Sequence, residues 1–156
     1  MRQLILLLFA SICTALIQPL SGDQQGQAPV FESPQSRAWA DSVLNTMSIE
    51  QQLGQLFMVA AYSNKGPDHV AEIQQLIQEQ HIGGLIFFQG GPLRQAKLTN
   101  KYQALAKVPL MIAMDAEWGL GMRLDSTFNF PWAMSLGAIQ NPSLIYEMGS
   151  AIAKHC

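Results

Sequence analysis

From Pro109 to Met122 the chain reads Pro-Leu-Met-Ile-Ala-Met-Asp-Ala-Glu-Trp-Gly-Leu-Gly-Met, and Arg123 follows at once. The apolar run within it has no polar alternation, which is typical of a strand that is buried on both faces in a parallel sheet. In parallel α/β folds, ligands bind where the strands end at their carboxyl side. The pattern therefore predicts that Asp115 and Glu117 lie at a site that meets a polar substrate.

The composition of the chain is that of a globular protein. It has 156 residues, of which 49% are hydrophobic and 13% charged, and a formal net charge of -2. This length suits one modest domain. The 9 lysines and arginines form no basic run, so the chain lacks the electrostatic footprint of a nucleic-acid-binding protein. Nucleic acid is therefore not expected as a partner.

The first 22 residues predict a secretory signal peptide. A short start with one basic residue precedes an apolar core, Leu4 to Leu20, and small residues follow it. We expect export to the periplasm or the exterior and, after cleavage, no stable membrane span. One alternative is a membrane anchor, for which the run is short and interrupted. Another is a lipoprotein signal at Cys13, which the preceding Ile12 disfavours.

The two cysteines carry no predicted chemistry. Cys13 lies in the predicted signal peptide and Cys156 is the last residue, so no internal disulfide is expected after cleavage. Neither cysteine has the spacing of a metal ligand or a nucleophile.

Helices and strands alternate after a predicted linker at residues 23–35, which is rich in Gln, Gly and Pro. Helical spacing predicts a helix over residues 36–46, and Ser48 with Gln51 forms a capping box that opens the next helix. Apolar runs then predict three strands, separated by amphipathic segments. The strands are expected at residues 56–61, 85–88 and 110–114. The helices are expected to begin at Pro67 with an apolar face that reaches Ile77, to run from about 93 to 106, and to open at Asn141-Pro142 with an inner stripe that reaches Ile152.

Strand, loop and helix in steady succession indicate a parallel sheet. Three strands do not close a barrel, because a (β/α)8 barrel typically needs about 250 residues. We therefore expect an α/β fold that forms the first three or so units of a partial (β/α)8 barrel, over residues 36–156, in a truncated chain.

Each residue of the predicted site also has a structural interpretation. Asp115 could cap its own loop, and the Glu117 side chain could point away from the site. Trp118 could stack on a sugar or plug the barrel mouth, and Arg123 could be solvated or donate to a ligand acceptor. The spacing of the two acids does not support a general acid/base pair, because carboxylates two residues apart on one loop rarely flank a scissile bond.

Four blocks, in order, resemble the amino-terminal part of the catalytic domain of glycoside hydrolase family 3, and most of all its β-N-acetylhexosaminidase branch. They read Met-Ser-Ile-Glu-Gln-Gln-Leu-Gly-Gln-Leu-Phe-Met (47–58), Ile-Gly-Gly-Leu-Ile-Phe-Phe (82–88), Pro-Leu-Met-Ile-Ala-Met-Asp-Ala-Glu-Trp-Gly (109–119) and Phe-Pro-Trp-Ala-Met-Ser-Leu-Gly-Ala (130–138). The resemblance spans residues 47–156, which is nearly all of the chain after the linker.

The resemblance implies a barrel whose pocket holds the terminal sugar of a β-linked glycan. Asp115 falls on the family's sugar-binding aspartate and Arg123 on the arginine that joins it in the hexosaminidase branch. The family hydrolyses β-glycosides with retention, through an aspartate nucleophile. That nucleophile and the acid/base histidine lie on later strands outside this chain, so the chain alone is expected to be inactive. No cofactor is implied.

One departure from the family pattern concerns sugar preference. The hexosaminidases often follow the aspartate with Gln-Glu-Gly-Gly-Arg, whereas this chain has Ala-Glu-Trp-Gly-Leu. The leading hypothesis is an exported glycosidase for terminal β-linked N-acetylglucosamine, with Asp115, Arg123, Glu117 and Trp118 as substrate-binding residues. The alternatives are a β-glucosidase or xylosidase of the same family, and an exported sugar-binding module without catalysis.

Overall fold

A computed structural model describes residues 30–156 of the protein. The predicted signal peptide and most of the predicted linker lie outside the described residues. The chain divides into two compact units, with the boundary between Ser42 and Val43. The described part of the first unit holds the 3-10 helix η1 (Val30–Glu32) and most of α2 (Pro34–Leu44), neither of which buries a residue.

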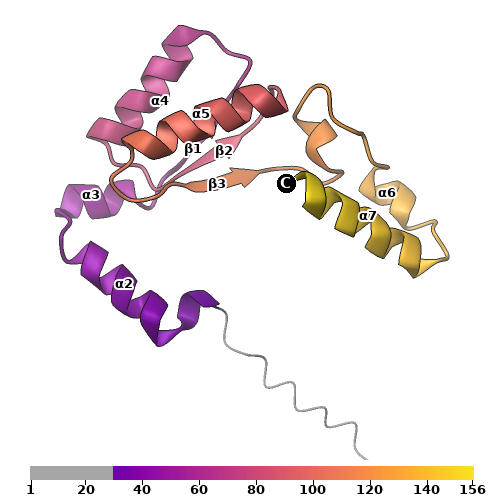
Figure 1. Ribbon diagram of the computed structural model, residues 1–156, viewed down its shortest axis with the longest axis horizontal. Helices are drawn as coiled ribbons and strands as arrows, with labels where there is room; N and C mark the ends of the chain where they lie inside the picture. Colours follow the sequence, from indigo (N-terminus) through magenta and orange to yellow (C-terminus); the bar gives the residue numbers. More distant parts are fainter. Residues whose placement is uncertain (1–29) are drawn as a thin grey trace, which may run out of the picture. The chain divides into compact units, whose positions relative to one another are not determined.

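The second unit contains a sheet of three parallel strands in the order β1-β2-β3, with helices between them (Figure 1). This confirms the predicted α/β fold and the three predicted strands. The elements of the unit are α3 (Ile49–Gly54), β1 (Met58–Ala61), α4 (Pro67–Glu79), β2 (Gly84–Phe87), α5 (Pro92–Leu105), β3 (Met111–Met114), η2 (Leu120–Met122), α6 (Ala133–Leu136) and α7 (Pro142–His155).

Local sequence sets where the helices begin. Ser48 and Gln51 form the predicted capping box of α3, each side chain accepting a hydrogen bond from the other residue's backbone N–H. Proline occupies the first turn of α4, α5 and α7, where its missing N–H costs no helical hydrogen bond. At α7 the side chain of Asn141 also accepts from the Ser143 N–H, as expected of a cap.

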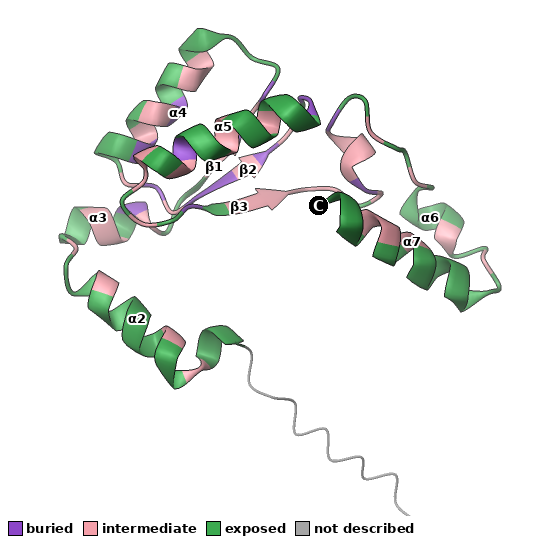
Figure 2. Ribbon diagram, viewed as in Figure 1, coloured by how far each residue is buried: buried purple, intermediate pink, exposed green. Residues whose placement is uncertain are grey.

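One face of the sheet packs against α4 and α5. The strands are in register, so that Val59, Leu85 and Ile112 form one row and Ala61, Phe87 and Met114 form another. These rows belong to a core that includes side chains from both helices, and Figure 2 shows the buried residues concentrated on β2 and on the helix faces toward it. The buried core residues are Ala61, Ile73, Ile77, Ile82, Leu85, Phe87, Tyr102 and Leu110.

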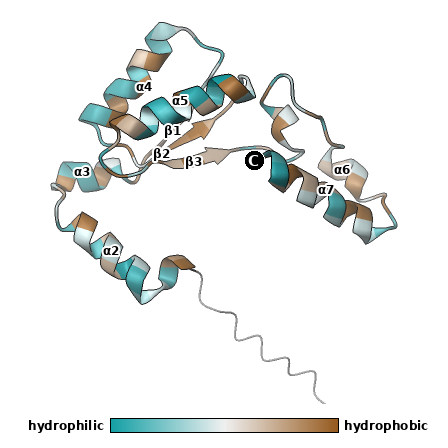
Figure 3. Ribbon diagram, viewed as in Figure 1, coloured by the Kyte–Doolittle hydropathy of each residue, from teal (hydrophilic) through white to brown (hydrophobic). Residues whose placement is uncertain are grey.

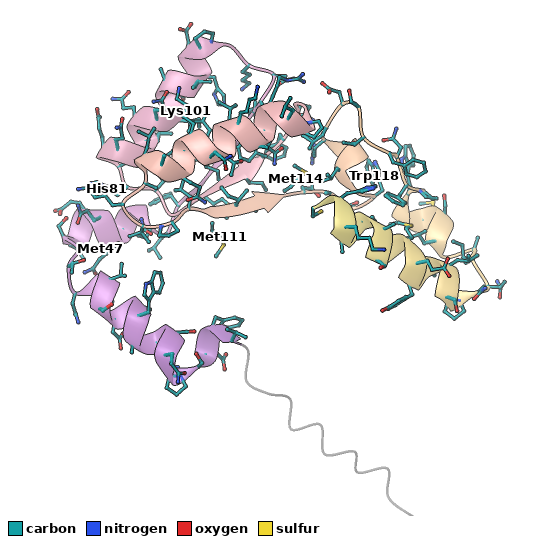
Figure 4. The ribbon with its side chains drawn as sticks, in the orientation of Figure 1. Met47, His81, Lys101, Met111, Met114 and Trp118 are labelled. Carbon is teal, nitrogen blue, oxygen red and sulfur yellow. The ribbon has the colours of Figure 1, made fainter. Side chains whose placement is uncertain are left out.

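The prediction that β3 is buried on both faces is wrong. Met111 is 68% exposed, and its neighbour across the sheet, Met58, is 40% exposed. Figure 4 shows the Met111 side chain pointing away from α5. Both α4 and α5 cover the other face, and no helix of the second unit covers the row that holds these methionines. An apolar run shows that both faces of a strand carry apolar side chains. It does not show that another element packs against each face.

The apolar stripe of α7 is also less buried than its spacing predicts. Leu144 is 52% exposed and Ile145 38%, and α7 buries none of its residues. Its Ile152 instead lies next to the loop that follows β3, within 3.4 Å of the position that a Cβ on Gly119 would take. The core face of the sheet is already occupied by α4 and α5.

Among residues 30–156, no helix has both the length and the hydropathy needed to cross a membrane. Figure 3 shows hydrophilic and hydrophobic residues mixed along each helix, whereas the strands are predominantly hydrophobic.

The buried Tyr102 of α5 offers a stability prediction. Its side chain is fully buried, and its hydroxyl has no hydrogen-bond partner among the described residues. Burial also raises the pKa of this phenol. Because an unpaired buried hydroxyl costs about 1–3 kcal/mol, Tyr102→Phe should raise the free energy of unfolding by about 1 kcal/mol in urea titrations.

Tyr146→Phe, at a residue that is 80% exposed, is the control and should leave the free energy of unfolding unchanged. A clear loss of stability in Tyr102→Phe would contradict this account.

Candidate functional site

Three side chains follow directly on the three strands. Tyr62 comes after β1, Phe88 after β2 and Asp115 after β3. The strands are parallel, neighbouring and in register, so these residues meet at the carboxyl edge of the sheet. The sequence had predicted Phe88 as the last residue of a buried strand, but β2 ends at Phe87 and Phe88 is half-buried at the edge.

Asp115 and Arg123 contact each other at this edge. Arg123 Nη2 donates to Asp115 Oδ2 at 2.5 Å, and Arg123 Nε donates to the Asp115 carbonyl oxygen at 2.9 Å. The arginine side chain is 15% exposed and that of the aspartate 41%. Asp115 therefore presents part of its carboxylate to solvent while Arg123 is largely enclosed.

A tight turn makes this contact possible although the two residues are eight positions apart. The Gly119 N–H donates to the Ala116 carbonyl at 2.9 Å, and η2 then returns the chain toward Asp115. Gly119 has a φ of 83°, which L side chains rarely adopt, and a Cβ there would lie 2.8 Å from the Phe130 ring. The glycine that follows Trp118 is therefore required by the turn itself.

The segment after η2 is anchored to the loop after β2. The Gly90 N–H donates to the Arg123 carbonyl at 3.1 Å, and the Asp125 N–H donates to the Gly90 carbonyl at 2.8 Å. Gly90 and Leu124 thus form a parallel bridge that extends the sheet by one pair. This bridge holds the backbone of Arg123 beside the end of β2.

Arg94 and Asp125 form an ion pair that joins the start of α5 to the segment after η2. Arg94 Nε also donates to the Ser63 carbonyl at 3.2 Å, and the buried Ser63 hydroxyl accepts from the Gly91 N–H at 3.0 Å. Arg94, at the start of α5, therefore connects the segments that follow β1 and β3, and the Ser63 hydroxyl connects the first of these to the loop after β2.

Because of this ion pair, we expect the free energy of unfolding to depend on pH. The hydrogen bond from Arg94 lowers the pKa of Asp125 below its ordinary value. A lowered pKa in the folded state means that the pair stabilises the protein above the unfolded pKa of about 4 and that this contribution is lost as the pH falls through the lowered pKa. The difference in unfolding free energy between the wild type and Asp125→Asn should therefore shrink below about pH 4 in urea titrations. A difference that stays constant from pH 7 to pH 3 would contradict it.

Glu117 and Trp118 lie on the turn but outside the Asp115–Arg123 contact. Glu117 is exposed, and it forms no side-chain hydrogen bond or ion pair with any described residue. Trp118 is half-buried, beyond the carboxyl end of β3 (Figure 4). Its ring centroid lies 5.8 Å from that of Trp132, which is 68% exposed. The structure thus brings Asp115 and Arg123 together, and it places Glu117 and Trp118 beside that contact, on the turn at the rim of the carboxyl edge.

Two aromatic residues that the sequence did not single out belong to this edge. The Arg123 guanidinium carbon lies 4.7 Å from the Phe88 ring centroid, and Phe88 is stacked on Tyr62 with centroids 5.7 Å apart. Tyr62 directly follows the predicted strand 56–61, just as Asp115 follows its own, so that signal was present in the sequence, whereas Phe88 fell inside the predicted strand 85–88. His69 supports Tyr62 by accepting its backbone N–H at 3.2 Å.

One groove in the second unit lies away from this edge. Its volume is about 410 Å³, and its lining is mostly apolar, with Leu53, Val59 and Ile82 beside the polar Glu50 and Gln80. It lies at the amino ends of the strands, where the structure places none of the predicted site residues.

The chemistry of the carboxyl edge is that of hydrogen-bonded recognition. Asp115 supplies an acceptor, and the Nη1 group of Arg123 is a donor that forms no hydrogen bond with the described residues. Acceptor and donor side by side suit neighbouring hydroxyl groups of a neutral ligand. Within residues 30–156, no cluster of three or more His, Cys, Asp or Glu side chains is arranged to hold a metal ion.

Comparison with known proteins points in one direction. Residues 48–156 match the family model described as "Glycosyl hydrolase family 3 N terminal domain". A Cellulomonas fimi protein named Beta-N-acetylglucosaminidase/beta-glucosidase is 24% identical over 127 residues. That alignment covers 81% of this chain and 22% of the relative, so the chain spans about a fifth of the relative's length.

A solved structure has the same fold. The structure titled "Beta-glucoside phosphorylase BglX bound to 2FGlc" matches with a TM-score of 0.51 and 22% identity, over 67% of this chain and 17% of the other. This likeness bears on the fold alone. Together with the family match, it identifies the three parallel strands as part of a (β/α)8-type barrel.

Proposed function

Because the chain belongs to glycoside hydrolase family 3, we propose that its protein hydrolyses terminal β-linked N-acetylglucosamine and that Asp115 and Arg123 bind the terminal sugar. The observation that carries this proposal is the direct contact between a part-exposed carboxylate and a guanidinium at the end of β3. A sugar offers both donors and acceptors on adjacent carbons, so Asp115 accepts from one hydroxyl while Arg123 donates to a neighbouring oxygen.

Such bonds contribute to catalysis when they strengthen as the sugar ring distorts toward the transition state. The nucleophile and the acid/base belong to later strands of the barrel in this proposal. Glu117 and Trp118, at the rim, contact the sugar or the group attached to it.

A β-glucosidase is the second candidate. The relative from Cellulomonas fimi carries both activities in its name. The hexosaminidases often have glycine where this chain has Trp118. This difference favours a sugar preference other than N-acetylglucosamine.

A panel of p-nitrophenyl β-glycosides separates these candidates in the active enzyme. We expect kcat/KM for the N-acetylglucosaminide to exceed that for the glucoside and the xyloside by at least about tenfold, which corresponds to about one well-placed polar contact. The reverse preference would select the glucosidase, and binding without turnover of any glycoside would leave a sugar-binding module.

We also propose that the protein is exported, with residues 1–22 as a cleaved signal peptide. The supporting observation is the basic start followed by an apolar core and small residues. Mass spectrometry of the exported protein should find an amino terminus near residue 23. An intact Met1 in the exported material would contradict cleavage.

A further inference from the structure

Arg123 is held at three points, two on its guanidinium and one on its backbone. Its Nε and Nη2 groups, which form one edge of the planar group, both donate to Asp115. Its backbone carbonyl accepts from the Gly90 N–H at 3.1 Å. The third restraint is the Phe88 ring, whose centroid lies 4.7 Å from the guanidinium carbon.

The two hydrogen bonds do not hold the guanidinium by themselves. Both go to one residue whose side chain is 41% exposed, so water can displace them and let the guanidinium swing away from Asp115 together with its Nη1 group. An aromatic face packed against the guanidinium restricts this motion, because the cation is attracted to the electron-rich ring face. Phe88 therefore controls an orientation that Asp115 alone does not.

Phe88 is itself held in place by its neighbours. Its ring is stacked on Tyr62 with an interplanar angle of 23°, and the Phe88 N–H donates to the Ala61 carbonyl at 2.9 Å. Lys65 Nζ lies 3.7 Å from the Tyr62 ring centroid. The loop after β1 thus supports Phe88, and Phe88 supports the arginine that contacts the end of β3.

We propose that Phe88 is a positioning residue that orients Arg123, so that its free Nη1 edge faces the ligand bound at Asp115. This proposal rests on the proposed function only for the identity of that ligand as a sugar. Phe88 itself is not assigned any contact with the substrate.

The variants Phe88→Leu and Phe88→Tyr separate orientation from simple space filling. Leucine keeps an apolar side chain but lacks a ring face, whereas tyrosine keeps the ring. The first readout is the solvent exchange rate of the Arg123 Nε–H in 15N-resolved NMR of the full chain, with its signal identified by its loss in Arg123→Lys. We expect exchange about tenfold faster in Phe88→Leu and within about twofold of the wild type in Phe88→Tyr.

Equal exchange in the wild type and Phe88→Leu would overturn the proposal, and so would equally fast exchange in both variants. Should Phe88→Leu fail to fold, Phe88→Met supplies the ringless variant, with the same two outcomes. The second readout is kcat/KM of the active enzyme, which should fall about tenfold in Phe88→Leu and recover in Phe88→Tyr. An enzyme that binds no sugar would refute the proposed function, while the exchange rates would still decide the role of Phe88.

Discussion

Replacing Asp115 by asparagine should lower kcat/KM for the preferred β-glycoside by about 10²- to 10³-fold in the active enzyme. The carboxylate accepts hydrogen bonds from sugar hydroxyls in the proposed function, and bonds to a charged group contribute about 1.5–3 kcal/mol each. Asparagine has nearly the same shape but carries no charge and turns one acceptor into a donor. Steady-state kinetics on the p-nitrophenyl glycoside measure the loss.

The same substitution should affect folding much less. Arg123 keeps its Nε hydrogen bond to the carbonyl of residue 115 and its contact with Phe88, so the free energy of unfolding should fall by only about 1 kcal/mol. Asp68→Asn is the matched control, because Asp68 is an exposed acid in the first turn of α4. We expect it to leave both kinetics and stability near the wild type. If kcat/KM in Asp115→Asn stays within about threefold of the wild type, Asp115 does not bind the sugar.

The largest loss of stability should come from Gly83→Ala. A Cβ on Gly83 would lie 2.0 Å from the carbonyl oxygen of Gln55 and 3.0 Å from its Cα. These are backbone atoms at the end of α3, and no side-chain rotation relieves the overlap. The Gly83 N–H also donates to the carbonyls of Gly54 and Phe57, both at 3.1 Å, so separating the segments breaks two hydrogen bonds. Overpacking of this kind costs about 3 kcal/mol of unfolding free energy, measurable in urea.

Gly149→Ala is the matched control for this prediction. Gly149 lies inside α7, and a Cβ there would meet nothing within 4 Å. Alanine in a helix interior is favoured over glycine, so this variant should be more stable by about 0.5–1 kcal/mol. A Gly83→Ala protein as stable as the wild type would mean that α3 does not pack against the start of β2 as closely as described.

The elements that the sequence predicted well are those with local causes. The capping box of Ser48 and Gln51 opens α3 as expected, and proline or asparagine starts the later helices. The three apolar runs became three parallel strands, within two residues of their predicted bounds. Hydrophobic periodicity and capping act over a few residues, so they can be recognised without knowing what packs against what.

The predictions that failed depended on packing. The run before Asp115 is apolar throughout, yet Met111 is exposed because the helices cover only the other face of the sheet. The apolar residues of α7 have helical spacing, yet Leu144 is 52% exposed and the helix buries none of its residues, while α4 and α5 supply the helical part of the core. Periodicity shows which residues of an element can be buried, and the arrangement of neighbouring elements decides which of them are.

The sequence alone determined the order and type of the elements, the position of Asp115 at the end of a strand and the family that its blocks resemble. Only the tertiary structure decided that Arg123 contacts Asp115 and that Phe88, 35 positions before Arg123, lies against its guanidinium. The physical reason is that these contacts depend on strand register, on the turn at Gly119 and on the bridge between Gly90 and Leu124. The register and the bridge join residues that are remote in the chain, and no local pattern encodes their distance.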